Sequence, residues 1–156
     1  MTQHRRDTYI DGHEILKRAA RYLSQIRDVL DDAREQEHSE RVNMLLTSVE
    51  LEQRNLLGAV ERYLEDAPEK ILNTYAQYTV EIPSEVEPPE EPLTTLSLTQ
   101  WLLRQNGLLQ AMFAELADKG EKANAEERRV VFGGLADQLE SHNRLLSTEY
   151  QRFEDL

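Results

Sequence analysis

Four polar residues stand where amphipathic helices would otherwise place apolar side chains or lie beside such a position. Gln53, Gln105 and His142 each interrupt an apolar stripe near the middle of a predicted helix, and Glu50 lies one turn before Gln53. His142 is the one member of this set that titrates near neutral pH, and its imidazole can exchange hydrogen bonds or bind a metal ion. If the helices are aligned, these side chains meet at one depth as a polar layer.

The polar layer has a structural and a functional interpretation. In the structural one, Gln53, Gln105 and His142 hydrogen-bond one another or a buried water, which fixes the register of the helices at some cost in stability. In the functional one, these three residues and Glu50 line a small pocket that binds a ligand or a single ion. Two neighbouring residues enter the layer if the stripes are shifted: Glu52 and Gln138.

The first half of the chain predicts a pair of long amphipathic helices. Asp11 is the expected N-cap of the first, which ends near residues 34–38, and Ser39 is the expected cap of the second. Apolar residues recur at spacings of three and four, which places them on one face of each helix. The stripes are Leu16, Ala19, Leu23, Ile26, Leu30 and Ala33, then Val42, Leu46, Val49, Leu56, Val60 and Tyr63.

The second half predicts another pair with the same periodicity. Ser97 with Gln100 forms a capping box for the third helix, Gly120 is a suitable stop, and Asn124 opens the fourth. The stripes are Leu98, Leu102, Leu109, Met112 and Leu116, then Phe132, Leu135, Leu139, Leu146, Glu149 and Phe153. Because the connections within each pair are short, the helices of a pair are antiparallel neighbours.

Between the two pairs, residues 67–78 predict a short separate helix and residues 79–96 an extended crossover. The crossover holds five glutamates, four prolines and no basic residue, a composition that favours extended, solvated chain. Its 18 residues reach about 55 Å when extended, whereas a 25-residue helix is about 38 Å long. We therefore expect an all-α four-helix bundle in which the crossover runs the length of the molecule. Residues 1–10 are expected as a tail and 11–156 as a single domain.

This arrangement, with inward polar residues at mid-height, resembles the ferritin-like architecture over residues 11–155. Members with a dimetal site hold it with one glutamate on each of two helices and a Glu-x-x-His pair on each of the other two. The corresponding positions here are Leu23, Glu50 with Gln53, Gln105, and Leu139 with His142. Leucines and neutral amides do not offset the charge of two divalent ions, so we expect no dimetal site and no cofactor. The one literal Glu-x-x-His string, Glu35 to His38, falls where the first helix ends.

Composition narrows the classes of function. The formal net charge of −12 disfavours a nucleic-acid partner, because phosphate backbones are anionic too. There is no cysteine, no apolar run long enough for a membrane span and no apolar leader, which favours a cytoplasmic protein. We find no nucleophile with a supporting base and no glycine-rich phosphate loop, so we do not expect an enzyme.

The sequence therefore leads to three functional hypotheses. The first is a non-catalytic ferritin-like bundle that acts through protein contacts, most simply as a homodimer. The second is a ferritin-like protein that binds a metal or a small ligand in a mid-bundle pocket of Gln53, Gln105, His142 and Glu50. The third, which rests on the acidic charge alone, is an adaptor or chaperone for a basic partner protein.

Overall fold

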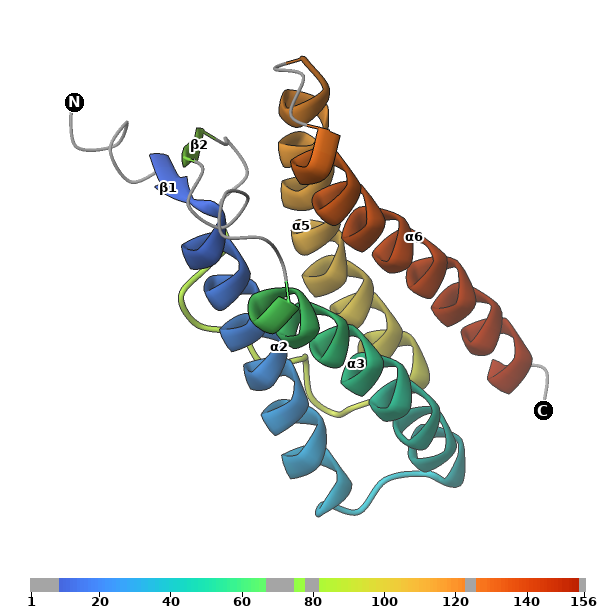
Figure 1. The fold of residues 1–156 in the computed structure, drawn as a ribbon. Helices are drawn as coiled ribbons and strands as arrows, with labels where there is room; N and C mark the ends of the chain where they lie inside the picture. Colours follow the sequence, from blue (N-terminus) through green and yellow to red (C-terminus); the bar gives the residue numbers. More distant parts are fainter. Residues whose placement is uncertain (1–8, 67–74, 78–81, 123–125, 155–156) are drawn as a thin grey trace, which may run out of the picture.

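The computed structural model contains four long helices and one short strand pair (Figure 1). The residues that it describes are 9–66, 75–77, 82–122 and 126–154. In chain order the elements are β1 (Tyr9–Asp11), α2 (Gly12–Arg34), α3 (Glu40–Asp66), β2 (Tyr75–Gln77), α5 (Thr95–Lys122) and α6 (Glu126–Glu154).

The four helices form an all-α bundle, as predicted. Helix α2 packs along α3, α5 packs along α6, and α3 joins the two pairs by packing against α6. Helices α3 and α5 run in the same direction, so the chain has to return along the molecule between them (Figure 1). This return is made by the predicted crossover, of which residues 82–94 are described.

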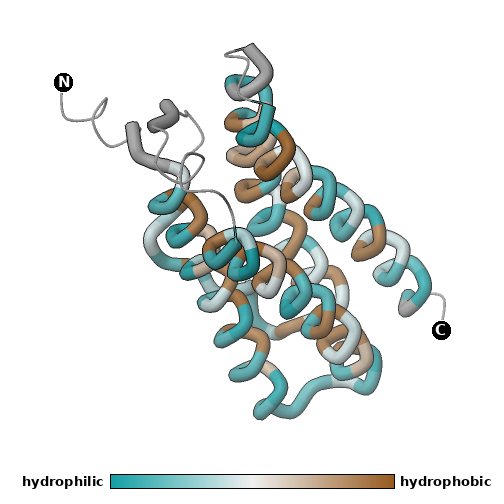
Figure 2. The backbone as a smooth tube through the Cα atoms, viewed as in Figure 1, coloured by the Kyte–Doolittle hydropathy of each residue, from teal (hydrophilic) through white to brown (hydrophobic). Residues whose placement is uncertain are grey.

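The described apolar residues of the predicted helix stripes lie in the core or pack against it. Brown, hydrophobic segments of the backbone line the inner faces of the helices and teal segments lie outside (Figure 2). The six stripe residues of α2 are all buried, and Leu45, Leu57 and Val131 widen the core beyond the stripes. Each fully buried leucine contributes about 1.5–3 kcal/mol by leaving water. Because the outer faces are charged, none of the described helices has an apolar stretch long enough to cross a membrane.

The crossover packs against the bundle and so forms part of its wall. The half-buried side chains of Ile82, Val86 and Leu93 lie on the core. The Gln25 amide of α2 donates to the Ser84 carbonyl at 2.9 Å and accepts from the Val86 N–H at 2.7 Å. On the other side, Trp101 of α5 donates its indole N–H to the Glu87 carbonyl at 2.6 Å. The crossover is therefore held by side chains from both helix pairs.

Two helix starts can be compared with their predicted caps. The Ser39 hydroxyl accepts from the Val42 N–H at 3.2 Å, which confirms the predicted cap of α3. Helix α5 begins at Thr95, two residues before the predicted cap Ser97. The capping box is Thr94 with Ser97: Thr94 Oγ1 accepts from the Ser97 N–H at 3.0 Å, and Ser97 Oγ accepts from the Thr94 N–H at 2.8 Å.

Two helix boundaries differ from the predictions or cannot be compared. Gly120 is not a stop, because α5 continues to Lys122. The predicted start of the fourth helix at Asn124 lies outside the described residues, and α6 is described from Glu126.

The predicted short helix at residues 67–78 is wrong for the part that the structure describes. Tyr75–Gln77 is strand β2, which pairs antiparallel with β1 in the register Tyr9 with Gln77, Ile10 with Ala76 and Asp11 with Tyr75. Residues 67–74 and 78 lie outside the described residues. Strand β1 begins within the segment that we expected as a tail. Backbone pairing with a distant segment here overrides the helical preference read from local sequence.

Candidate functional site

A buried cluster of two amides and one imidazole lies at the centre of the bundle. Gln53 of α3 and Asn106 of α5 exchange two hydrogen bonds, of 3.3 Å from Gln53 Nε2 to Asn106 Oδ1 and 2.8 Å from Asn106 Nδ2 to Gln53 Oε1. His142 Nε2 of α6 lies 2.8 Å from Gln53 Oε1. All three side chains are buried, with Asn106 wholly inaccessible. We call these three residues the amide–imidazole cluster.

The hydrogen bonds of this cluster fix the proton on His142. Gln53 Oε1 is an acceptor, so the ring nitrogen that faces it, Nε2, must carry hydrogen and donate. Burial lowers the pKa of His142 from 6.5 to about 4, so the ring is neutral at pH 7. Glu52 Oε2, 3.6 Å from His142 Nδ1, favours the charged ring, but this carboxylate is one-third exposed and desolvation prevails. His142 Nδ1 therefore presents a lone pair toward Glu52.

Gln105 lies beside this cluster in sequence but bonds elsewhere. Its Oε1 accepts a hydrogen bond from the Tyr22 hydroxyl of α2, and both side chains are buried. Burial raises the pKa of Tyr22, and the charge of Glu87 raises it further, so the hydroxyl stays a donor. The predicted meeting of Gln105 with Gln53 and His142 is not among the described contacts, and Asn106 bonds to Gln53 instead.

Glu50 is also directed away from the cluster. Its carboxylate pairs with the Arg34 guanidinium across the outer side of the α2–α3 contact. A hydrogen bond to Glu50 raises the pKa of Asp31, with smaller contributions in the same direction from burial and from the Glu50 charge. Glu50 thus belongs to a charged cluster at the surface. Of the four predicted site residues, the described contacts join Gln53 and His142 only.

The positions implied by the ferritin-like resemblance can be compared with the described side chains. Among the residues that the structure describes, no group of three or more histidine, aspartate or glutamate side chains is placed to hold a metal ion. Leu23 and Leu139, at two of the positions implied by the ferritin-like resemblance, are buried apolar residues. In the Glu35 to His38 string, His38 Nε2 bonds to the Ala33 carbonyl at 2.7 Å.

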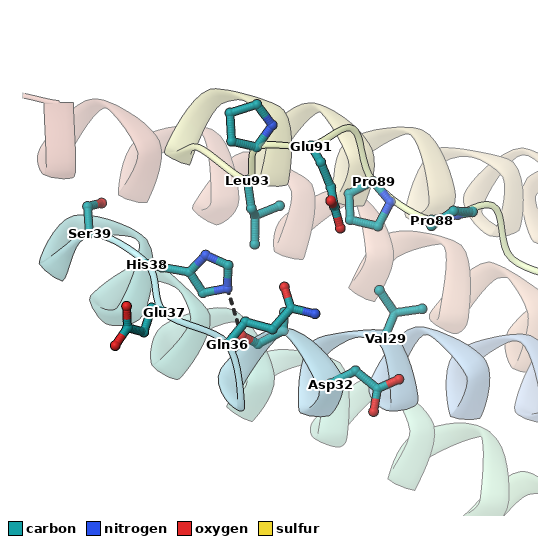
Figure 3. A pocket seen from close by; sticks show the side chains of 12 residues that line it. Val29, Asp32, Gln36, Glu37, His38, Ser39, Pro88, Pro89, Glu91 and Leu93 are labelled. Carbon is teal, nitrogen blue, oxygen red and sulfur yellow. Dashed lines mark hydrogen bonds between the residues drawn. The ribbon is translucent and has the colours of Figure 1, made fainter.

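A second feature is a groove of about 700 Å³ between the α2–α3 turn and the end of the crossover (Figure 3). Glu91 and Leu93 extend from the crossover toward α2, where Val29 lies on the opposite wall (Figure 3). We call it the crossover groove. Its lining residues are Val29, Asp32, Ala33, Gln36, Glu37, His38, Ser39, Pro88, Pro89, Glu91, Pro92 and Leu93.

A third feature is a small pocket of about 170 Å³ on the surface between α3 and α6, beside His142. We call it the α3–α6 notch. Its lining residues are Glu52, Leu56, Gln138, Ser141, His142 and Leu145. Glu52 and Gln138, the two residues expected to join the polar layer if the stripes were shifted, thus meet His142 at this notch.

The sequence interpretation missed Asn106. A second stripe with three-four spacing runs along the same helix and shares several leucines with the predicted one: Thr95, Thr99, Leu102, Asn106, Leu109, Phe113 and Leu116. All of these side chains are buried. Because α5 contacts more than one helix, both stripes face protein, and reading them together would have found Asn106.

Comparison with known proteins adds no identification: no protein-family model, curated protein or solved structure matches this chain. The class defined by the described residues is an all-α four-helix bundle with a packed crossover.

Proposed function

We propose that this protein is a non-catalytic helical bundle that binds a cationic, partly apolar segment of a partner protein in the crossover groove. The observation that carries the proposal is the combination of an apolar lining with three acidic side chains and no lysine or arginine. The groove's volume lies within the range of about 300–1,000 Å³ that is typical of ligand pockets.

The apolar part of the groove supports the burial of a side chain from the partner. Val29 and Leu93 are half-buried on opposite walls, and Pro88, Pro89 and Pro92 add rigid apolar surface. Prolines restrict the backbone, so this wall loses little conformational entropy when a partner binds. The Trp101 and Gln25 hydrogen bonds hold the adjacent crossover residues in place.

The charged part of the groove supports the choice of a cationic partner. Asp32, Glu37 and Glu91 are exposed at its rim, and no lysine or arginine lines it. The net charge of −12 adds a long-range attraction for basic proteins. Rim charges of this kind steer association and select partners, while the apolar contacts supply most of the affinity.

Fluorescence anisotropy with labelled peptides tests this proposal. The probe is a peptide of alternating arginine and leucine, compared with an arginine–serine peptide and a glutamate–leucine peptide of the same length. We expect the arginine–leucine peptide to bind tightest. The double variant Asp32→Lys/Glu91→Lys should weaken its binding about fivefold or more, because two rim ion pairs are replaced by repulsion. Raising the salt from 0.05 to about 0.5 M should weaken it too.

The matched control is a double reversal outside the groove. Glu61→Lys/Glu65→Lys changes the net charge equally on the exposed side of α3. If this control weakens binding as much as Asp32→Lys/Glu91→Lys, overall charge rather than the groove attracts the peptide. Equal affinity for the arginine–serine peptide would likewise overturn the proposal, because the apolar lining would then have no role.

The proposal also includes a ferritin-like relationship, a homodimer and a cytoplasmic location. The parallel course of α3 and α5 supports a ferritin-like relationship (Figure 1). Exposed Met44 and Leu51 lie two turns apart on α3 and support a homodimer, whose test is molar mass by light scattering. We also propose that the protein acts in the cytoplasm. If dimerisation were lost in Asp32→Lys/Glu91→Lys, a second copy rather than another protein would occupy the groove.

A further inference from the structure

The α3–α6 notch contains a buried nitrogen without a hydrogen-bond partner. The His142 side chain is only 4% exposed, and its Nδ1 atom is inaccessible to solvent. This atom nevertheless accepts no hydrogen bond. A buried polar atom left in this state costs about 1–3 kcal/mol, which makes it an informative feature. The atom faces Glu52, whose carboxylate lines the notch, so two acceptors stand side by side with no donor between them.

The amide–imidazole cluster holds His142 in the form that a cation requires. Because Nε2 donates to Gln53 Oε1, the lone pair is on Nδ1. Histidines that bind metals have this arrangement, with the second ring nitrogen donating to a fixed acceptor that sets tautomer and orientation. Asn106 in turn fixes the Gln53 amide through two hydrogen bonds. The buried cluster is thus an orienting support for a nitrogen that faces Glu52.

The separation of the two acceptors fits one shared transition-metal ion. With bonds of about 2.0–2.1 Å to imidazole nitrogen and 2.0–2.2 Å to carboxylate oxygen, an N–metal–O angle near 120° separates the donors by about 3.6 Å. The measured distance between His142 Nδ1 and Glu52 Oε2 is 3.6 Å. Gln138 and Ser141 line the same notch and carry further oxygen atoms.

From this geometry we propose that the α3–α6 notch is a mononuclear site for a divalent cation of the zinc class, with His142 Nδ1 and Glu52 as its two principal ligands. Imidazole nitrogen favours Zn²⁺, Ni²⁺ or Cu²⁺, whereas Mg²⁺ and Ca²⁺ prefer oxygen ligands alone. The site is separate from the crossover groove and from any dimetal site at the bundle centre.

The test is calorimetric titration of the untagged, chelator-treated full chain with ZnCl₂. We expect one saturable site, at least tenfold weaker in Glu52→Gln and lost in His142→Gln, and unaffected by excess Mg²⁺. Glu52 is partly exposed, so Glu52→Gln tests the site even if His142→Gln fails to fold. The control Glu61→Gln removes the same charge from an exposed position of α3 and should leave the affinity unchanged.

A nuclear magnetic resonance measurement identifies the ligating atom. Two-bond ¹H–¹⁵N spectra of the histidine rings should show Zn²⁺ shifting the Nδ1 resonance of His142 and leaving its Nε2 resonance protonated. Absence of saturable Zn²⁺ binding, equal binding by Glu52→Gln, or a shift confined to His4, His13 or His38 would each overturn the proposal.

Discussion

Gln53 makes all three hydrogen bonds of the buried amide–imidazole cluster, and replacing it with leucine tests how much these bonds contribute to stability. Gln53→Leu keeps the side-chain volume nearly constant but removes three hydrogen bonds. It leaves three buried groups without partners: Asn106 Oδ1, Asn106 Nδ2 and His142 Nε2. At about 2 kcal/mol each they cost about 6 kcal/mol, and the leucine restores about 2 kcal/mol by apolar burial.

We therefore expect Gln53→Leu to lower the free energy of unfolding by about 4 kcal/mol. The triple variant Gln53→Leu/Asn106→Leu/His142→Leu removes every member of the cluster. Because it leaves no orphaned partner, it should be as stable as the wild type or more so. Polar core residues help to fix the register of packed helices. Their removal should therefore make unfolding of the triple variant less cooperative, which is measured as a smaller dependence of the unfolding free energy on urea concentration.

The assay is urea unfolding, followed by circular dichroism and by the fluorescence of Trp101, the single tryptophan, which is buried. Gln100→Leu, on the exposed face of α5, is the matched control and should change stability by less than about 0.5 kcal/mol. A loss below about 1 kcal/mol in Gln53→Leu, or a triple variant as unstable as the single one, would refute the reasoning, since neither fits a buried cluster held by these three hydrogen bonds.

Two further predictions follow from pH and from the capping geometry. Because the pKa of His142 is lowered from 6.5 to about 4 on folding, the unfolded chain binds the proton more tightly. Stability should therefore fall as the pH drops from 7 through this window, by about 2 kcal/mol at pH 5. Comparing urea unfolding of the wild type and His142→Gln isolates this contribution, and parallel pH profiles would contradict it. Thr94→Ala should cost about 1 kcal/mol by removing the cap of α5, whereas Thr47→Ala, an exposed mid-helix control on α3, should cost less. Equal losses in thermal unfolding would show that the cap contributes nothing.

The helices were predictable because their signal is repeated many times. A stripe such as Leu16 to Ala33 repeats one spacing over several turns, and the charged residues between its members report the solvent face. Helix α2 ends at Arg34, within the predicted range of residues 34–38, and α3 begins after its predicted cap Ser39. The start of α5 was placed three residues late, because Thr94 and Ser97 are both good caps and one sequence does not rank them.

The strand pair was not predictable for a different reason. Tyr9–Asp11 and Tyr75–Gln77 are three residues each and more than 60 positions apart. Such short segments have no measurable period, and what stabilises them is pairing with each other. Local propensity therefore favoured a helix near Tyr75, where the partner strand decides otherwise.

The sequence predicted how far along each helix the polar residues lie, but not toward which neighbouring helix each side chain points. The reason is that each helix contacts several neighbours. At 100° per residue, Glu50 and Glu52 lie on opposite sides of Gln53 around α3. Glu50 meets Arg34 of α2, while Glu52 meets His142 of α6. On α5, Gln105 and its successor Asn106 likewise turn to α2 and α3. A single apolar stripe is an adequate description of a helix that has one neighbour. Inside a bundle a helix has several neighbours, and the helix that lies beside a given position decides which of two consecutive polar residues joins a site.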